Sequence, residues 1–152
     1  MAILIVDDDE DTRAIMARLL TNDGYQDVIT AASGEQAVSL LSSDIPMQLD
    51  LIFLDVNMPN LDGIQSCARI REDAKYRTVP IVMTTARTEM NTIDRAFKSG
   101  ATDYLTKPLK AVDFLACVRA KLRLKAELDR RDLLESKLAR HAPFEFLQSA
   151  RL

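Results

Sequence analysis

The sequence predicts an α/β protein: a doubly wound, five-stranded parallel sheet with an extended last helix. Three observations favour this fold class. Short apolar or β-branched runs recur between residues 2 and 106, and segments with helical periodicity separate them. The runs are almost continuously apolar, which is typical of parallel strands that helices cover on both faces.

The expected strands are residues 2–6 (AILIV), 27–31 (DVITA), 51–54 (LIFL), 79–84 (VPIVMT) and 102–106 (TDYLT). A helix is expected in each of the four gaps between them. Ile15, Leu19 and Leu20 show helical spacing in the first gap, and the apolar residues after SGEQ show it in the second. Ser33 and Gln36 form a capping-box pattern at the start of this second helix.

The chain after Pro108 is expected to form one continuous helix over residues 109 to about 140, because it has no Gly or Pro until after Ala142. This is longer than a five-stranded sheet needs, so the distal half should leave the domain. The leucines at 124, 128, 134 and 138 form a stripe that is interrupted at Arg131 and requires a partner. We expect a weak or phosphorylation-sensitive homodimer; the alternative is a tail that folds back onto the domain through Phe144 and Phe146.

Length and composition indicate one domain, residues 1–122, followed by a helical extension or linker, residues 123–152. No apolar run is long enough to cross a membrane, and the N-terminus turns acidic too early for a signal peptide, so we expect a cytoplasmic protein. Cys67, Cys117 and His141 are too few and too scattered for a disulfide framework or a zinc site. The extension is basic while the rest of the chain is acidic, but a solvated helix or dimer stalk is favoured over nucleic-acid binding.

Polar residues collect where the expected strands end. Asp7, Asp8 and Asp9 follow the first strand and Asp55 follows the third, while Thr84, Thr85 and Ala86 end the fourth, and Lys107 with Pro108 ends the fifth. In an open parallel sheet such positions meet at one edge. Carboxylates without His or thiolate suit a hard ion, Mg²⁺ ahead of Mn²⁺ or Ca²⁺. Acids also suit the first turn of a helix, which is the alternative reading of the acidic run at residues 7–9.

Four motifs in this order resemble the receiver domain of two-component response regulators. They are Asp7 with Asp8, Asp55 followed by VNMPNLDG, the TTA at 84–86, and the Lys-Pro at 107–108. The resemblance covers about residues 2–122. It implies the flavodoxin-like strand order 2-1-3-4-5, which periodicity alone does not establish.

The resemblance also implies a chemistry for these residues. Asp55 accepts a phosphoryl group from a histidine kinase or a phosphotransfer protein, with Mg²⁺ held by Asp8, Asp55 and the Asn57 carbonyl, and by Asp7 through water. Lys107 contacts the phosphoryl group. Thr85, Ala86 and the aromatic Tyr104 form the switch, although Tyr104 could also simply pack at the sheet edge. Pro108 is expected to follow a cis peptide bond, as in the family.

Two other function classes fit the sequence less well than this switch. A Mg²⁺-dependent phosphohydrolase or phosphotransferase of the haloacid dehalogenase type needs a second carboxylate two residues after the nucleophile, where this chain has Asn57. A pseudo-receiver would lack one of the acidic, Asp55 or Lys107 positions, and this chain lacks none. The output, the kinase, and whether the chain is a stand-alone receiver or part of a longer regulator are left open by the sequence.

Overall fold

The computed structural model describes residues 1–43, 48–86 and 89–141. The strands are β1 (Ala2–Val6), β2 (Asp27–Ala31), β3 (Leu49–Asp55), β4 (Ile81–Thr85) and β5 (Asp103–Thr106). The helices are α1 (Glu10–Asn22), α2 (Gly34–Ser42), α3 (Gly63–Arg71), α4 (Met90–Lys98) and α5 (Ala111–His141), with a short 3₁₀ turn η1 (Ala74–Tyr76) before β4. Strands and helices alternate as the sequence predicts.

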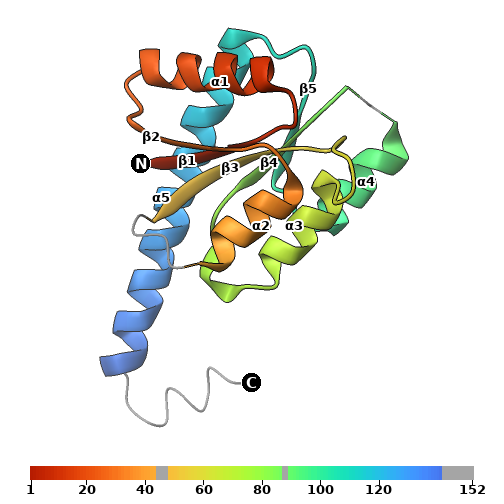
Figure 1. The fold of residues 1–152 in the computed structure, drawn as a ribbon. Coiled ribbons are helices and arrows are strands. Elements are labelled where there is room, and N and C mark those ends of the chain that lie inside the picture. The colour runs from red at the N-terminus through yellow and green to blue at the C-terminus, as the bar shows by residue number, and fades with distance from the viewer. Residues whose placement is uncertain (44–47, 87–88, 142–152) are drawn as a thin grey trace.

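All strand pairs are parallel, and the sheet order is β2-β1-β3-β4-β5 (Figure 1). This confirms the predicted fold class and the 2-1-3-4-5 order. The register pairs Val6 with Leu54 and Asp55 with Thr84, and it pairs Thr85 with Thr106. The carboxyl ends of β1, β3, β4 and β5 therefore finish at nearly the same level, and the residues that follow them share one edge.

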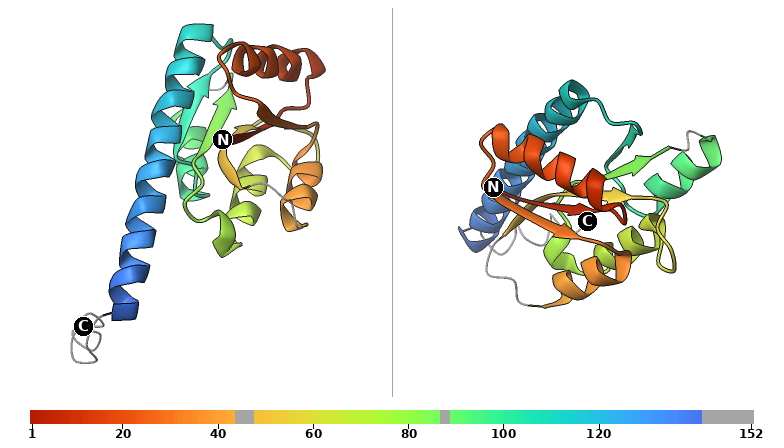
Figure 2. Two further views of the ribbon diagram at one scale, coloured as in Figure 1. Left: turned by 90° about the vertical axis from the view of Figure 1, so that its left-hand side faces the viewer. Right: turned by 45° about the horizontal axis from the view of Figure 1, so that its top comes forward.

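Two buried clusters cover the two faces of the sheet, because successive side chains along a strand point to opposite sides. Ile3 and Ile5 of β1 pack with α1 and α5, whereas Leu4 and Val6 pack with α2 and α3. Figure 2 shows α1 and α5 on one face and the other helices on the opposite face. Phe53 and Phe114 lie at the centre of the first cluster with ring centroids 4.8 Å apart. This double covering explains why the strands are continuously apolar.

The second helix begins much as expected, with one difference. The Ser33 hydroxyl accepts a hydrogen bond from the Gln36 N–H at 3.0 Å, which is the first half of a capping box. The Gln36 side chain accepts from the N–H of Ala32 instead of the N–H of Ser33, so the predicted reciprocal bond is absent. The reciprocal pair forms at α3, between Asp62 and Gln65.

Helix α5 is continuous over 31 residues, which confirms the predicted long terminal helix. Its second half passes beyond the sheet (Figure 2, left). It crosses residues 122 and 123 without a break, so the proposed division between domain and extension at that point stays a prediction. Phe144 and Phe146 lie outside the described residues.

Polar contacts hold the second half of α5 against the amino-terminal end of the sheet. The Lys125 cluster consists of Lys125 with Asp50 (3.9 Å) and with Asp129, Thr78 with Asp129 (3.2 Å), and Arg77 with Asp132 (2.8 Å). Lys125 is only 2% exposed. Among the described residues, no helix is both long enough and apolar enough to cross a membrane.

Candidate functional site

Backbone hydrogen bonds fix the strand ends that carry the candidate site. The N–H of Asp7 donates to Ala31 O at 3.2 Å, and the N–H of Lys107 donates to Thr85 O at 2.8 Å. The N–H of Val56, directly after Asp55, donates to Thr84 O at 3.0 Å. Ladder bonds thus reach the functional residues themselves, which leaves their backbone little freedom while their side chains point beyond the sheet edge.

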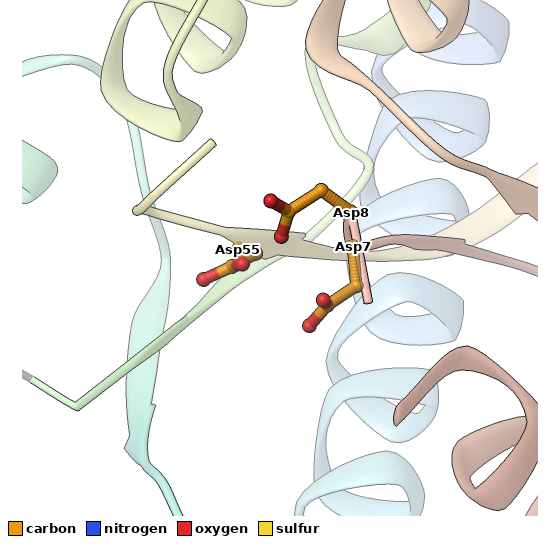
Figure 3. A group of neighbouring side chains, drawn as sticks. All are labelled: Asp7, Asp8 and Asp55. Atoms are coloured by element: carbon orange, nitrogen blue, oxygen red, sulfur yellow. The ribbon is translucent and has the colours of Figure 1, made fainter. Parts of the chain in front are cut away.

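Three carboxylates gather at this edge. One oxygen from each of Asp7, Asp8 and Asp55 lies within 4.8 Å of the others. Figure 3 shows Asp7 and Asp8, from the end of β1, beside Asp55 at the tip of β3. Asp7 and Asp55 are buried, whereas Asp8 is exposed. A set of closely spaced carboxylate oxygens fits a hard divalent cation such as Mg²⁺.

Lys107 joins the carboxylates from the end of β5. Its Nζ donates to Asp7 Oδ2 at 2.8 Å and lies 3.3 Å from Asp55 Oδ1. Burial alone lowers the pKa of Lys107, but the hydrogen bond to Asp7 and the charge of Asp55 outweigh burial and raise it. The ammonium therefore stays charged and offsets part of the negative charge of the cluster.

The surroundings of Asp55 change the pKa of its carboxyl group. Burial first, and the negative charge of Asp7 second, raise the pKa of Asp55 to about 6. The charge of Lys107 and a hydrogen bond from the N–H of Asn57 to Asp55 Oδ1, at 3.2 Å, act in the opposite direction. The ionised form of Asp55 is poorly solvated and close to other negative charge. A bound cation, or the ammonium of a nearby lysine, therefore stabilises it.

The fourth strand contributes Thr84 and Thr85, which are both buried, and Ala86, which is exposed. Tyr104 lies in β5, half-buried, and its ring packs edge-on against Phe97 of α4 with centroids 6.2 Å apart. The structure therefore brings Asp7, Asp8, Asp55 and Lys107 into one cluster and puts Thr85 on the strand next to Asp55. Tyr104 lies one strand further out, in the edge strand β5, and its ring contacts α4.

Two further residues support the site, and sequence reasoning missed or undervalued them. The guanidinium of Arg13 donates to Asp7 O at 2.7 Å, which ties α1 to the end of β1; a basic residue near the start of the first helix was its only signal. The second residue is Gly63, the first residue of α3. A Cβ at Gly63 would lie 2.1 Å from Asp55 O, so glycine is required for α3 to begin so close to the tip of β3.

The bond between Lys107 and Pro108 is cis, as expected. Gly100 has a φ of +111° and directly follows Ser99, the residue that caps the end of α4. Cys67 and Cys117 are free, and burial raises the pKa of both thiols. Thiols with a raised pKa are poor nucleophiles, which is typical of cysteines that serve packing.

The chain is similar to response regulators over most of its length. A family model described as the response regulator receiver domain matches residues 3–119. The response regulator PleD of Caulobacter vibrioides is 37% identical over 127 residues, which are 84% of this chain and 27% of PleD. The transcriptional regulatory protein YvrH of Bacillus subtilis is 37% identical over 80% of this chain and 49% of YvrH. The chain thus spans half or less of the length of these relatives.

Solved structures show the same similarity. The chemotaxis protein CheY4 of Vibrio cholerae superposes with a TM-score of 0.72 at 31% identity, over 79% of this chain and 98% of that protein. A two-component response regulator from Clostridium difficile gives a TM-score of 0.72 at 35% identity, over 81% and 96% of the two chains. The similarity therefore extends from the sequence motifs to the whole five-stranded fold.

Proposed function

Because this chain belongs to the response regulator receiver family, we propose that it is a signalling switch controlled by phosphorylation of Asp55. The observation that carries this proposal is the tip of β3, where Asp55 lies beside Asp7, Asp8 and Lys107. A chain of this family is a switch and not a classical enzyme, so the chemistry is confined to its own side chain. The haloacid dehalogenase alternative receives no support from the relatives.

Asp55 is the proposed nucleophile. In the proposed step a carboxylate oxygen bonds to phosphorus while the bond from phosphorus to the imidazole nitrogen of a phosphohistidine breaks, and the imidazole keeps the electron pair. Such transfers proceed through a loose transition state, so the protein mainly positions groups and neutralises charge. The rigid backbone around Val56 supports this role because it holds the carboxylate at the sheet edge.

Asp7, Asp8 and Asp55, with the backbone carbonyl of Asn57, are the residues that we propose hold Mg²⁺, for which Mn²⁺ or Ca²⁺ could substitute. The bound ion would supply positive charge to the phosphoryl oxygens. Lys107 supplies positive charge from the side of β5. Its ammonium already lies within reach of Asp55, so on phosphorylation it needs only to exchange a carboxylate oxygen for a phosphoryl oxygen.

Thr85, Ala86 and Tyr104 form the proposed switch. The Thr85 hydroxyl would bond a phosphoryl oxygen, and the small Ala86 would leave room for that group. A shift of Thr85 would change the space beside Tyr104, whose ring lies between the sheet and Phe97 of α4. The face formed by α4, β5 and α5 would then differ between the two states, and we propose that it carries the signal to an output domain or protein.

A surface for the phosphoryl donor lies beside the site. A groove of about 230 Å³ between α1 and the segment after β5 is lined by Thr12, Ile15, Met16, Leu19, Lys107, Pro108 and Leu109. Ile15 is 61% exposed there. An apolar groove that includes Lys107 suits docking of a histidine kinase or a phosphotransfer protein with its phosphohistidine near Asp55. Such donors imply that the chain works in the cytoplasm.

Phosphorylation tests the proposal directly. The full chain is incubated with acetyl phosphate and Mg²⁺, and its intact mass is measured. We expect an increase of one phosphoryl group that disappears in Asp55→Asn and on removal of Mg²⁺ by a chelator. Asp27→Asn, an exposed aspartate of β2, is the matched control and should be phosphorylated like the native chain. An adduct of undiminished yield on Asp55→Asn would contradict the assignment of the nucleophile.

A further inference from the structure

The second half of α5 has an inner side that its own domain covers. Val118 and Leu122 are buried against the sheet, Lys125 is buried beside Asp50, and Asp129 contacts Thr78. The last contact of the Lys125 cluster is made by Asp132. The helix is therefore held in one rotational setting as far as Asp132, and this setting decides which side chains face away.

A residue nine positions further along an α-helix lies two and a half turns on, and so on the opposite side. Nine positions after the inner residues Val118 and Leu122 come Glu127 and Arg131. Nine positions after the inner residues Lys125 and Asp129 come Leu134 and Leu138. These four form the outer face of α5. Leu134 is 61% exposed and Leu138 is 58% exposed. The helix thus carries an apolar pair on the side that its own domain leaves open.

Continued by Leu124, three residues before Glu127, the outer face of α5 has the spacing of a coiled-coil seam. Leu124, Glu127, Arg131, Leu134 and Leu138 follow one another at alternating intervals of three and four residues, as a and d positions of heptads do. Two of these positions carry opposite charges. In a pair of parallel helices the long Arg131 side chain lies one layer from Glu127 of the other copy, which offsets part of the cost of placing charge in the seam.

The flanking positions indicate which partner fits. With Arg131 and Leu138 at a and Leu134 at d, Arg130 occupies g and Glu135 occupies e. In parallel, in-register coiled coils a g residue faces the e residue that lies five positions later on the other helix. Arg130 therefore faces Glu135 of a second copy, with opposite charge, on both sides of the seam.

We propose that two copies of this chain pair in parallel and in register along the outer face of α5, from Leu124 to Leu138. The receiver domains then lie on opposite sides of the helix pair, because each is held on the inner side of its own helix by the Lys125 cluster. The helix needs no new nucleation, since its first half already packs on the sheet. The charged layers Glu127 and Arg131 make the dimer weak and reversible. This inference is independent of the phosphorylation proposal.

Neighbouring leucines provide the first test. Sedimentation equilibrium of the unphosphorylated full chain should show a monomer–dimer equilibrium. Leu134→Glu should weaken association by about tenfold or more, since it places charge at a d position. Leu133→Glu is the matched control: Leu133 is 52% exposed but lies off the seam, so its variant should stay within about twofold of the native chain. A native chain that stays monomeric, or equal effects of the two variants, would overturn the proposal.

Charge exchange tests the orientation. Arg130→Glu and Glu135→Arg should each self-associate less than the native chain, because each homodimer places like charges in facing g and e positions. An equimolar mixture of the two variants should associate again, since its mixed pairs are oppositely charged on both sides. Far-ultraviolet circular dichroism should show unchanged helix content. A mixture that associates no better than its components excludes the parallel, in-register arrangement, and none of these measurements uses a phosphoryl donor.

Discussion

The Nζ of Lys107 lies 2.8 Å from the Oδ2 of Asp7, although the two residues are 100 positions apart in the sequence. The contact joins the ends of β1 and β5, which are not neighbours in the sheet. Lys107 crosses the ends of β3 and β4 to reach Asp7, and it passes Asp55 on the way. One ammonium thus balances two buried carboxylates at rest, and this relationship gives the site measurable properties before any phosphorylation.

Lys107→Ala should destabilise the metal-free protein. Removing the ammonium leaves Asp7 and Asp55 close together without their positive partner, at a cost of about 2 kcal/mol in the free energy of unfolding; a fully buried pair would cost more. Mg²⁺ should restore part of this loss because it brings positive charge to the same carboxylates. Urea unfolding with chelator and with Mg²⁺ measures both effects. Lys110→Ala, an exposed lysine, is the control, and equal losses in the two variants would show that the contact with Asp7 contributes nothing.

The raised pKa of Asp55 predicts a pH dependence of stability. Its folded value of about 6 exceeds the model-peptide value of 3.8, so between these values the folded state binds more protons than the unfolded state. The contribution of Asp55 to stability therefore falls as pH rises from about 4 to about 6, and it stays low above that. In chelator, Asp55→Asn should be more stable than the native chain at pH 7 by about 3 kcal/mol.

Thermal or urea unfolding across this pH range checks the prediction. The advantage of Asp55→Asn should shrink as pH falls from 6 and vanish only below the unfolded-state value of 3.8, where the native carboxyl is protonated in both states. Asp27→Asn controls for the change of residue type at an exposed position. A difference between Asp55→Asn and the native chain that is constant with pH would contradict a raised pKa.

Asp8→Asn should weaken Mg²⁺ binding by about tenfold, because one charged oxygen ligand becomes neutral. Asp8 is exposed, so the substitution should leave the metal-free fold nearly as stable as before. The rise in melting temperature on addition of Mg²⁺ measures the binding, with Asp11→Asn as a control just outside the cluster. If Asp8→Asn keeps the full Mg²⁺-dependent rise, Asp8 is not a ligand.

Lys125→Met should lower the free energy of unfolding by about 2 kcal/mol. The methionine keeps the apolar stem buried but removes the charge that Asp50 and Asp129 face. Both carboxylates are partly exposed and can regain water, which limits the loss. Lys137→Met on the exposed part of α5 should change stability by less than about 0.5 kcal/mol. Urea unfolding of both variants decides whether the Lys125 cluster holds α5 to the domain.

Much of this fold could be predicted from the sequence because its signals are local. The apolar runs at 2–6 and 27–31 coincide with β1 and β2, and the long stretch without Gly or Pro became α5. The candidate site was predictable for a related reason. Parallel strands end at one edge, so residues that follow strands must meet there once the strands are correctly located. Asp55 stood out because a buried strand has little structural reason to end in a carboxylate.

Other features depended on the tertiary structure. A lysine within a charged helical segment predicts a solvated side chain, yet Lys125 is buried because the start of β3 brings Asp50 beneath it. The contact of Arg13 with Asp7 and the close approach of Gly63 to Asp55 also lie outside any local pattern. The sequence by itself determined which segments are strands and helices and which residues end them, because periodicity and turn chemistry act over a few residues. Only the tertiary structure decided which charges are buried and paired, because that depends on strand register and helix packing between residues far apart in the chain.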